Sequence, residues 1–105
     1  MSYELVLTDR AGADLEEAYR WYAERSPERA ARWYNGFLEA LGTLATNPQR
    51  CGLAPENARF PFEVRQLIYG KHHTYRALFT MRQERVVVLH VRHTARRQIR
   101  PEELP

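Results

Sequence analysis

Cysteine and long apolar runs are nearly absent from this sequence. Cys51 is the only cysteine among 105 residues, so an internal disulfide, a redox CxxC motif and a cysteine-based zinc ribbon are excluded. No apolar run approaches the ~20 residues that a transmembrane helix needs. The N-terminal MSYELVLTDR is typical of a strand rather than of a secretory signal. We therefore expect one cytosolic domain over residues 1–105, with no metal, no cofactor and no membrane contact.

Lysine is also scarce. Lys71 is the only lysine, and the other fifteen basic residues are arginines. Residues 1–49 hold five arginines against eight acidic residues, a net charge of −3, whereas residues 50–105 hold eleven basic against five acidic residues, a net charge of +6. The planar guanidinium suits bidentate contacts with phosphate or carboxylate, although codon usage alone also produces such a composition. The positions of the arginines must decide between these two interpretations.

Helical periodicity dominates the first half of the chain. Apolar residues between 11 and 22, and again between 30 and 44, recur at spacings of three and four, which is typical of one face of an amphipathic helix. Thr8 and Ser26 are suited to cap the two helices, and Asn47-Pro48 ends the second. The very short connection between the helices predicts an antiparallel hairpin.

Strand-like alternation marks the start and the second half of the chain. A short run at residues 3–7 is followed, after the helices and a turn-rich loop at 48–61, by three further runs at 62–69, 74–81 and 86–93. Short polar connections between the last three runs predict two consecutive hairpins. We therefore expect an α+β fold of order β-α-α-β-β-β, in which the helical hairpin packs on one face of an antiparallel meander.

One register of the last hairpin gives a continuous apolar face that the helices are expected to cover. This register pairs Met81 with Val87, Phe79 with Leu89, Ala77 with Val91, and Tyr75 with His93. In the preceding run the same face carries Phe62, Val64 and Ile68.

The opposite face is expected to be open and rich in arginine. It carries Arg65, Leu67, Tyr69, Arg76, Leu78, Val86, Val88, His90 and Arg92. No carboxylate in this set neutralises the arginines, and arginine beside an aromatic ring is typical of phosphate contact and base stacking. Two interpretations stay open: a solvated face of strand-forming residues, or a groove for an anionic polymer that an apolar partner segment masks at times.

The order and spacing of these segments resemble the RelE/ParE toxin superfamily of bacterial type II toxin–antitoxin systems. The resemblance covers nearly the whole chain, through TDRAGADLEEAYRWYAE, RWYNGFLEALGTLATNPQR, FEVRQLIYGKHHTYRALFTM and VVVLHVRHTARR. It implies a toxin that a cognate antitoxin neutralises in a hetero-oligomer. It also implies one of two activities, because RelE-like members cleave mRNA on the ribosome and ParE-like members inhibit DNA gyrase without hydrolysis.

The resemblance also suggests which residues act. Tyr75-Arg76 resembles the Tyr-Arg pair in which the arginine is catalytic in RelE-like toxins, and Arg65 matches an arginine common in the second strand. His93 and Arg96 resemble a closing His-x-x-Arg, with Arg97 adjacent. Two features of RelE are missing, namely the lysine pair before the catalytic arginine and a tyrosine after Arg97.

Cleavage of RNA through its 2′-hydroxyl needs a base, an acid and cations around one phosphate, and histidine suits the first two because its pKa is about 6.5. The candidate catalytic residues are Arg65, Arg76, His93 and Arg96. The candidate substrate-binding residues are Tyr69, Tyr75, His90, Arg92 and Arg97. For His93 a structural interpretation is also open, as a strand end bonded to its neighbour Tyr75.

Contacts with the antitoxin are expected on the helices and on the open face. The candidates are Trp21, Trp33, Leu67, Leu78, Val86 and Val88. Trp21 and Trp33 are chosen because they lie off the inward stripes of their helices, and exposed tryptophans are enriched in interfaces.

The resemblance implies two possible functions, and the basic second half of the chain adds a third. The first is a toxin that cleaves mRNA on the ribosome, the second is a gyrase-inhibiting toxin, and the third is a basic nucleic-acid-binding domain that is not a toxin. For a toxin that cleaves mRNA, Arg76→Ala should slow cleavage roughly a hundredfold. As an exposed strand residue, Arg76 should then contribute no more than about 0.5 kcal/mol to stability.

Overall fold

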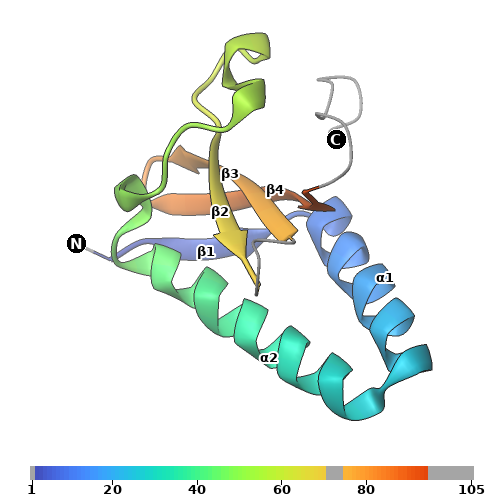
Figure 1. Ribbon diagram of the computed structural model, residues 1–105. Helices are drawn as coiled ribbons and strands as arrows, with labels where there is room; N and C mark the ends of the chain where they lie inside the picture. The colour runs from blue at the N-terminus through green and yellow to red at the C-terminus, as the bar shows by residue number, and fades with distance from the viewer. Residues whose placement is uncertain (1, 71–74, 95–105) are drawn as a thin grey trace.

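The computed structural model of the chain describes residues 2–70 and 75–94. Their elements are β1 (Glu4–Leu7), α1 (Asp9–Arg25), α2 (Pro27–Gly42), the 3₁₀ turns η1 (Thr43–Ala45), η2 (Pro48–Arg50) and η3 (Pro55–Arg59), β2 (Arg65–Tyr69), β3 (Tyr75–Arg82) and β4 (Arg85–His93). The predicted α+β order of β-α-α-β-β-β is confirmed (Figure 1).

Both helices begin at the predicted caps. The Thr8 hydroxyl accepts a hydrogen bond from the Ala11 amide at 3.1 Å and donates to the Leu89 carbonyl at 3.1 Å. The Ser26 hydroxyl accepts from the Arg29 amide at 3.3 Å. Each cap satisfies an amide that the helix itself leaves without a partner. Thr8 additionally ties the start of α1 to β4.

The four strands form one mixed sheet in the order β1-β4-β3-β2. The strands β2, β3 and β4 form the predicted antiparallel meander. At its edge β1 pairs with β4 in parallel, from Glu4 opposite Arg85 to Leu7 opposite Val88. Because β1 ends at Leu7, the rest of β4 extends past it toward α1 (Figure 1).

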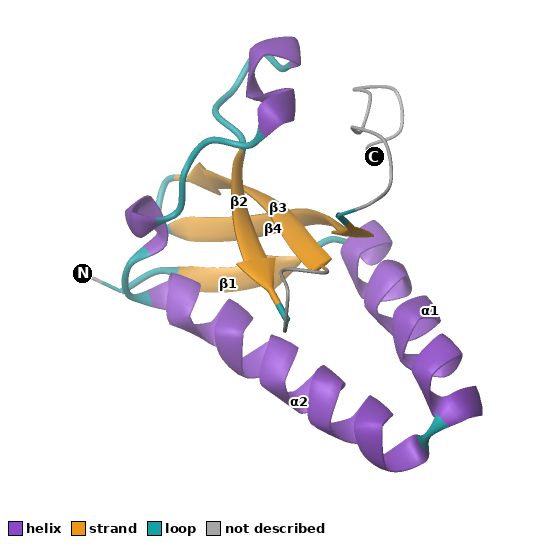
Figure 2. Ribbon diagram, in the orientation of Figure 1, coloured by secondary structure: helices purple, strands orange, loops and turns teal. Residues whose placement is uncertain are grey.

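The two helices form a V whose open end meets the sheet (Figure 2). The core lies between them and one face of the sheet, and it contains Ala11, Leu15, Phe37, Leu41, Leu44, Leu67, Ala77, Phe79, Val86, Val88 and Val91. Burial of these side chains stabilises the arrangement, since each large apolar side chain contributes about 1.5–3 kcal/mol when it leaves water.

The register between β3 and β4 changes in the middle of the hairpin. At the open end Tyr75 opposes His93, as predicted. Nearer the turn, Phe79 opposes Val88 instead of Leu89, because a bulge leaves Leu89 as an extra residue in β4. A shift of one residue moves every following side chain to the other face of a sheet. The predicted faces are therefore wrong for the half of β4 that adjoins the turn.

The face prediction is wrong for β2 as well. The predicted faces take their alternation from Phe62 and Val64, but the strand begins only at Arg65, and the residues before it are not extended strand. Leu67 and Tyr69 consequently face the helices and join the core, whereas Ile68 is exposed.

A loop covers the sheet face that the sequence suggested was open. Ala54, Val64 and Leu78 form a second buried cluster, against which Phe60 and Phe62 pack. These residues belong to the segment that contains η3, except Leu78, which belongs to β3. The segment rises from the sheet on the side away from α2 (Figure 1). At Leu78 this face is thus a small core rather than a groove.

Gly36 lies where α2 meets the ring of Tyr69. A Cβ atom at position 36 would lie 2.1 Å from the Tyr69 hydroxyl oxygen and 3.3 Å from Cζ. Gly36→Ala is therefore expected to destabilise the protein by about 1–3 kcal/mol through overpacking, although alanine is ordinarily the better helix former. Tyr69→Phe in the same chain should recover part of the loss. Thermal unfolding of the single and double variants tests this, and a stabilised Gly36→Ala protein would contradict it.

Candidate functional site

Arg76 is buried in an ion pair with Glu56. Its Nη1 donates to Oε1 of Glu56 at 2.8 Å, and its Nη2 donates to the other carboxylate oxygen. Nη1 also lies 3.2 Å from the side-chain oxygen of Gln66. The side chains of Arg76 and Glu56 are 7% and 0% exposed. The predictions of an exposed Arg76 and of a face without a carboxylate are wrong, because η3 brings Glu56 over β3.

The other sheet arginines do not converge with Arg76 on one exposed site. Arg92 opposes Arg76 in the register and is also buried. Arg65 pairs with Phe79, on the face that the helices cover. It bonds the Glu63 carboxylate at 2.9 Å and donates to the Cys51 carbonyl. Arg65 and Arg76 therefore lie on opposite faces of the sheet, and both are held by the chain itself.

His90 is also a buried residue, contrary to the prediction that it faces a substrate. Its Nδ1 lies 2.8 Å from Oδ2 of Asp14, and the same carboxylate oxygen accepts the Val91 amide at 3.0 Å. The reason is the early end of β1, since Asp14 of α1 meets the β4 backbone beyond the last residue of β1. Arg10 donates to the other oxygen of Asp14 at 3.2 Å. His90 and Asp14 thus dock the helix on the sheet.

Tyr69, Tyr75 and His93 lie on the helix side of the sheet. The rings of Tyr75 and His93 meet edge to face with centroids 5.1 Å apart, and His93 is exposed. Tyr69 stacks on Phe37 at 4.6 Å. Burial raises the pKa of the Tyr69 phenol, and Glu39 raises it further. The Tyr69 hydroxyl donates to the Trp33 carbonyl at 3.4 Å.

The predicted antitoxin contacts divide into exposed and buried residues. Trp21 is 51% exposed. Trp33 is half-buried among the rings of Tyr22, Phe37 and Tyr75. The four sheet candidates Leu67, Leu78, Val86 and Val88 are buried, so the prediction that they form an open apolar surface is wrong. The bulge in β4, the start of β2 at Arg65 and the η3 segment account for their burial.

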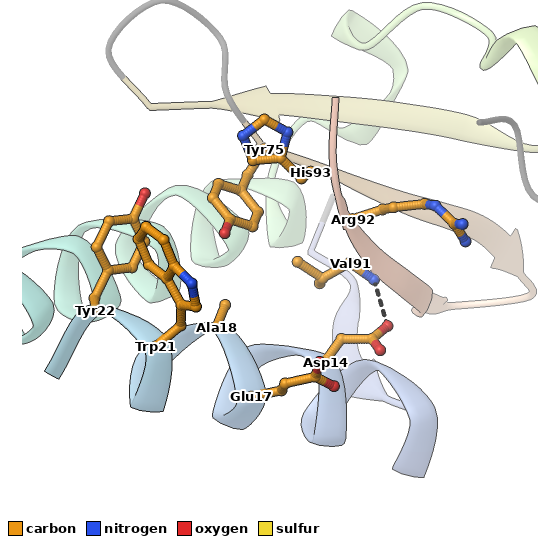
Figure 3. A pocket seen from close by; sticks show the side chains of 9 residues that line it. All are labelled: Asp14, Glu17, Ala18, Trp21, Tyr22, Tyr75, Val91, Arg92 and His93. Carbon is orange, nitrogen blue, oxygen red and sulfur yellow. Dashed lines mark hydrogen bonds between the residues drawn. The ribbon is translucent and has the colours of Figure 1, made fainter. Parts of the chain in front are cut away.

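A pocket of about 420 Å³ lies between α1 and the end of β4 (Figure 3). It is lined by Asp14, Glu17, Ala18, Trp21, Tyr22, Tyr75, Val91, Arg92 and His93. Four of these residues, Trp21, Tyr75, Arg92 and His93, were sequence candidates. Asp14, Glu17, Ala18 and Trp21 follow one another at helical spacing, so an acidic and aromatic stripe on α1 was visible in the sequence and was missed. This pocket is the candidate functional site.

Metal binding and nucleophilic attack by a thiol are two chemistries on which the described residues bear. Within 2–70 and 75–94, no three side chains of histidine, cysteine, aspartate or glutamate gather so that they could hold a metal ion. Burial raises the pKa of the Cys51 thiol, although Arg50 and Arg65 oppose the shift, so this side chain is a poor nucleophile. Arg96 and Arg97 lie outside the described residues, and their roles stay predictions.

Among residues 2–70 and 75–94, no helix has the length and apolar character that crossing a bilayer requires.

The chain matches known proteins in two comparisons, one with a family model and one with solved structures. The family model described as "ParE toxin of type II toxin-antitoxin system, parDE" matches residues 5–98. Among solved structures, the chain is similar to one titled "Chromosomal ParDE TA system from P. aeruginosa", with a TM-score of 0.71 and 22% sequence identity. That match covers 88% of this chain and 96% of the other. At this identity the likeness bears on the fold alone. No curated protein sequence matches the chain.

Proposed function

Since the chain belongs to the ParE toxin family of type II toxin–antitoxin systems, we propose that it stops growth by binding DNA gyrase rather than by cutting RNA. Membership makes the chain a toxin whose partner is a cognate antitoxin. The choice between the two modes of action rests on the geometry of the candidate residues.

The observation that carries the proposal is the buried pair of Arg76 and Glu56. A phosphate-cleaving site needs preorganised donors aimed at the developing negative charge. Arg76 donates to a carboxylate instead, and both groups are shielded from solvent. An arginine held in this way serves the fold, and a competing phosphate would have to displace an internal anion.

The positions of the other candidates support the same choice. Arg65 bonds a backbone carbonyl on the other face of the sheet, and His90 is docked on Asp14. Of the described histidine candidates, only His93 is exposed. A base, an acid and a cation are therefore not assembled around one point within the described residues. A toxin that acts by binding needs no such assembly.

Cleavage of mRNA on the ribosome is the competing function. His93 is exposed beside Tyr75 and lines the pocket, and Arg96 follows it in the His-x-x-Arg pattern. A single histidine with a nearby arginine is a smaller catalytic set than general acid–base cleavage ordinarily uses. We therefore treat cleavage as the alternative outcome of the experiment.

Induction of the toxin alone is expected to arrest bacterial growth, and co-expression of the antitoxin should restore it. With purified toxin, gyrase should fail to supercoil relaxed plasmid, while a purified translation system should keep making its reporter from uncut mRNA. Toxin incubated beforehand with antitoxin is the matched control and should leave supercoiling intact. Normal supercoiling together with ribosome-dependent cuts in the mRNA would overturn the proposal in favour of the nuclease.

A further inference from the structure

We propose that the pocket between α1 and the end of β4 receives an arginine side chain of the cognate antitoxin. The inference rests on the chain being a toxin with an antitoxin partner, and it does not depend on which target the toxin inhibits. Three features of the pocket carry it: the available negative charge, the aromatic walls, and the direction in which Arg92 points.

Glu17 supplies the available negative charge. It is exposed at the pocket, and within residues 2–70 and 75–94 it makes no ion pair or hydrogen bond. The nearby carboxylate of Asp14 is already engaged by Arg10, His90 and the Val91 amide. A cation that enters the pocket therefore meets one carboxylate that no described side chain neutralises.

The arginines of α1 cannot neutralise Glu17 without giving up other contacts. Arg10 bonds Asp14, and Arg20 bonds Glu16 at 2.7 Å. Arg25 donates to the Trp21 carbonyl at 2.8 Å and places its guanidinium carbon 3.6 Å from the centroid of the Trp21 ring. A cation from another molecule can thus pair with Glu17 and leave these contacts in place.

Aromatic rings form the rest of the pocket wall. Trp21 and Tyr22 meet edge to face at 5.2 Å, and Tyr75 and His93 meet at 5.1 Å. Figure 3 shows these two pairs around the space beside Ala18, with the carboxylates of Asp14 and Glu17 toward one end. Faces of aromatic rings attract cations electrostatically. The combination of rings with a carboxylate is suited to a guanidinium or an ammonium group.

Two further features favour arginine as the occupant. A planar guanidinium stacks on aromatic faces more readily than a hydrated ammonium group, and Arg25 already shows such a contact on Trp21. Trp21 lines the pocket and Arg25 does not. The volume of about 420 Å³ also accommodates a whole side chain.

Arg92 lines the same pocket without opposing a cation there. Its side chain points away from the four aromatic rings (Figure 3). Arg92 is paired with Arg76 in the register, so both residues lie on the face of the sheet opposite the helices. The charged groups that face the pocket from α1 are carboxylates, so the local charge favours a cationic ligand over an anionic one.

The first experiment uses N-acetylarginine amide as the probe and N-acetylcitrulline amide as its neutral control of the same shape. The indole N–H signal of Trp21 in ¹⁵N-labelled toxin should shift saturably with the arginine probe, with a dissociation constant on the order of 10 mM. The backbone amide of Ala54, which bonds the Val64 carbonyl in the buried cluster on the other face of the sheet, is the internal reference. Citrulline amide should bind at least about fivefold more weakly.

Variants then connect the pocket to the antitoxin. Glu17→Gln should weaken the arginine probe about two- to fivefold and weaken the antitoxin about tenfold. Glu16→Gln is the matched control, because Glu16 is the neighbouring exposed glutamate and lines a different pocket, between α1 and α2. It should change neither affinity. Trp21→Leu should also weaken the antitoxin about tenfold.

Each contrary result overturns the inference at a defined point. Equal binding of the arginine and citrulline amides, or no saturable shift, would show that the pocket does not recognise a cation. If Glu17→Gln weakens binding of the arginine probe as expected but leaves the affinity for the antitoxin unchanged, the arginine does not come from the antitoxin. Supercoiling and translation assays report separately on the mode of toxicity, so failure there leaves these binding results interpretable.

Discussion

Arg76→Ala is expected to lower the free energy of unfolding by about 3–5 kcal/mol, because it removes the bidentate partner of a carboxylate that stays buried. Glu56 is 0% exposed, and two of its hydrogen bonds come from Arg76. The expected loss far exceeds the effect of an ordinary surface substitution, which is about 0.5 kcal/mol or less. Urea denaturation followed by tryptophan fluorescence measures it.

Arg82→Ala provides the control in the same strand. Arg82 is exposed, and within residues 2–70 and 75–94 its guanidinium makes only a distant contact with the Phe62 ring, whose centroid lies 5.2 Å away. Its replacement should change stability by about 0.5 kcal/mol or less. The double variant Glu56→Leu with Arg76→Met should regain much of the loss, since an apolar pair replaces a desolvated ionic one. Equal stabilities of Arg76→Ala and Arg82→Ala would contradict the account.

The sequence predicted an exposed Arg76, whereas the structure buries it, and this difference has a definite physical source. Strand alternation correctly indicated that Arg76 and Arg92 share a face. It carried no information about what would cover that face, because the cover comes from the irregular segment around η3, twenty residues before Arg76 in the chain. Local periodicity describes strands and helices, whereas the path of a loop depends on contacts far away in sequence.

The predicted secondary structure is confirmed where the interactions that determine it are local. Thr8 and Ser26 cap the helices through amides three residues ahead, and the turn near Gln83 joins β3 directly to β4. The bulge at Leu89 was not foreseen. It coincides with the point where β1 stops and where Thr8, about eighty residues away in the chain, bonds the Leu89 carbonyl.

The candidate site was only partly predictable for the same reason. Trp21 was recognised because it lies off the inward stripe of its helix, and it is exposed as expected. Asp14 and Glu17 on the same helix were overlooked, since an acidic residue on an amphipathic helix ordinarily faces water. Their importance depends on β4 running past the end of β1, which brings Tyr75 and His93 opposite the helix.

Phe37→Ala is expected to lower the free energy of unfolding by about 3–5 kcal/mol, because the smaller side chain leaves a cavity at the centre of the aromatic core. The Phe37 ring is fully buried, stacks on Tyr69 at 4.6 Å and meets Trp33 edge to face at 5.5 Å. It also contacts Tyr75, with centroids 6.5 Å apart, so it links the core to the wall of the pocket.

The next residue of α2 is the matched control for Phe37. Leu38 is 38% exposed, and Leu38→Ala should cost no more than about 1 kcal/mol because little of a well-packed core is lost. Urea denaturation of both variants gives the comparison, and near-ultraviolet circular dichroism reports whether the remaining rings keep fixed environments. We expect the aromatic signal to weaken in Phe37→Ala alone, since Tyr69 and Tyr75 lose the ring between them. Similar losses at the two positions would show that the aromatic cluster does not hold α2 on the sheet.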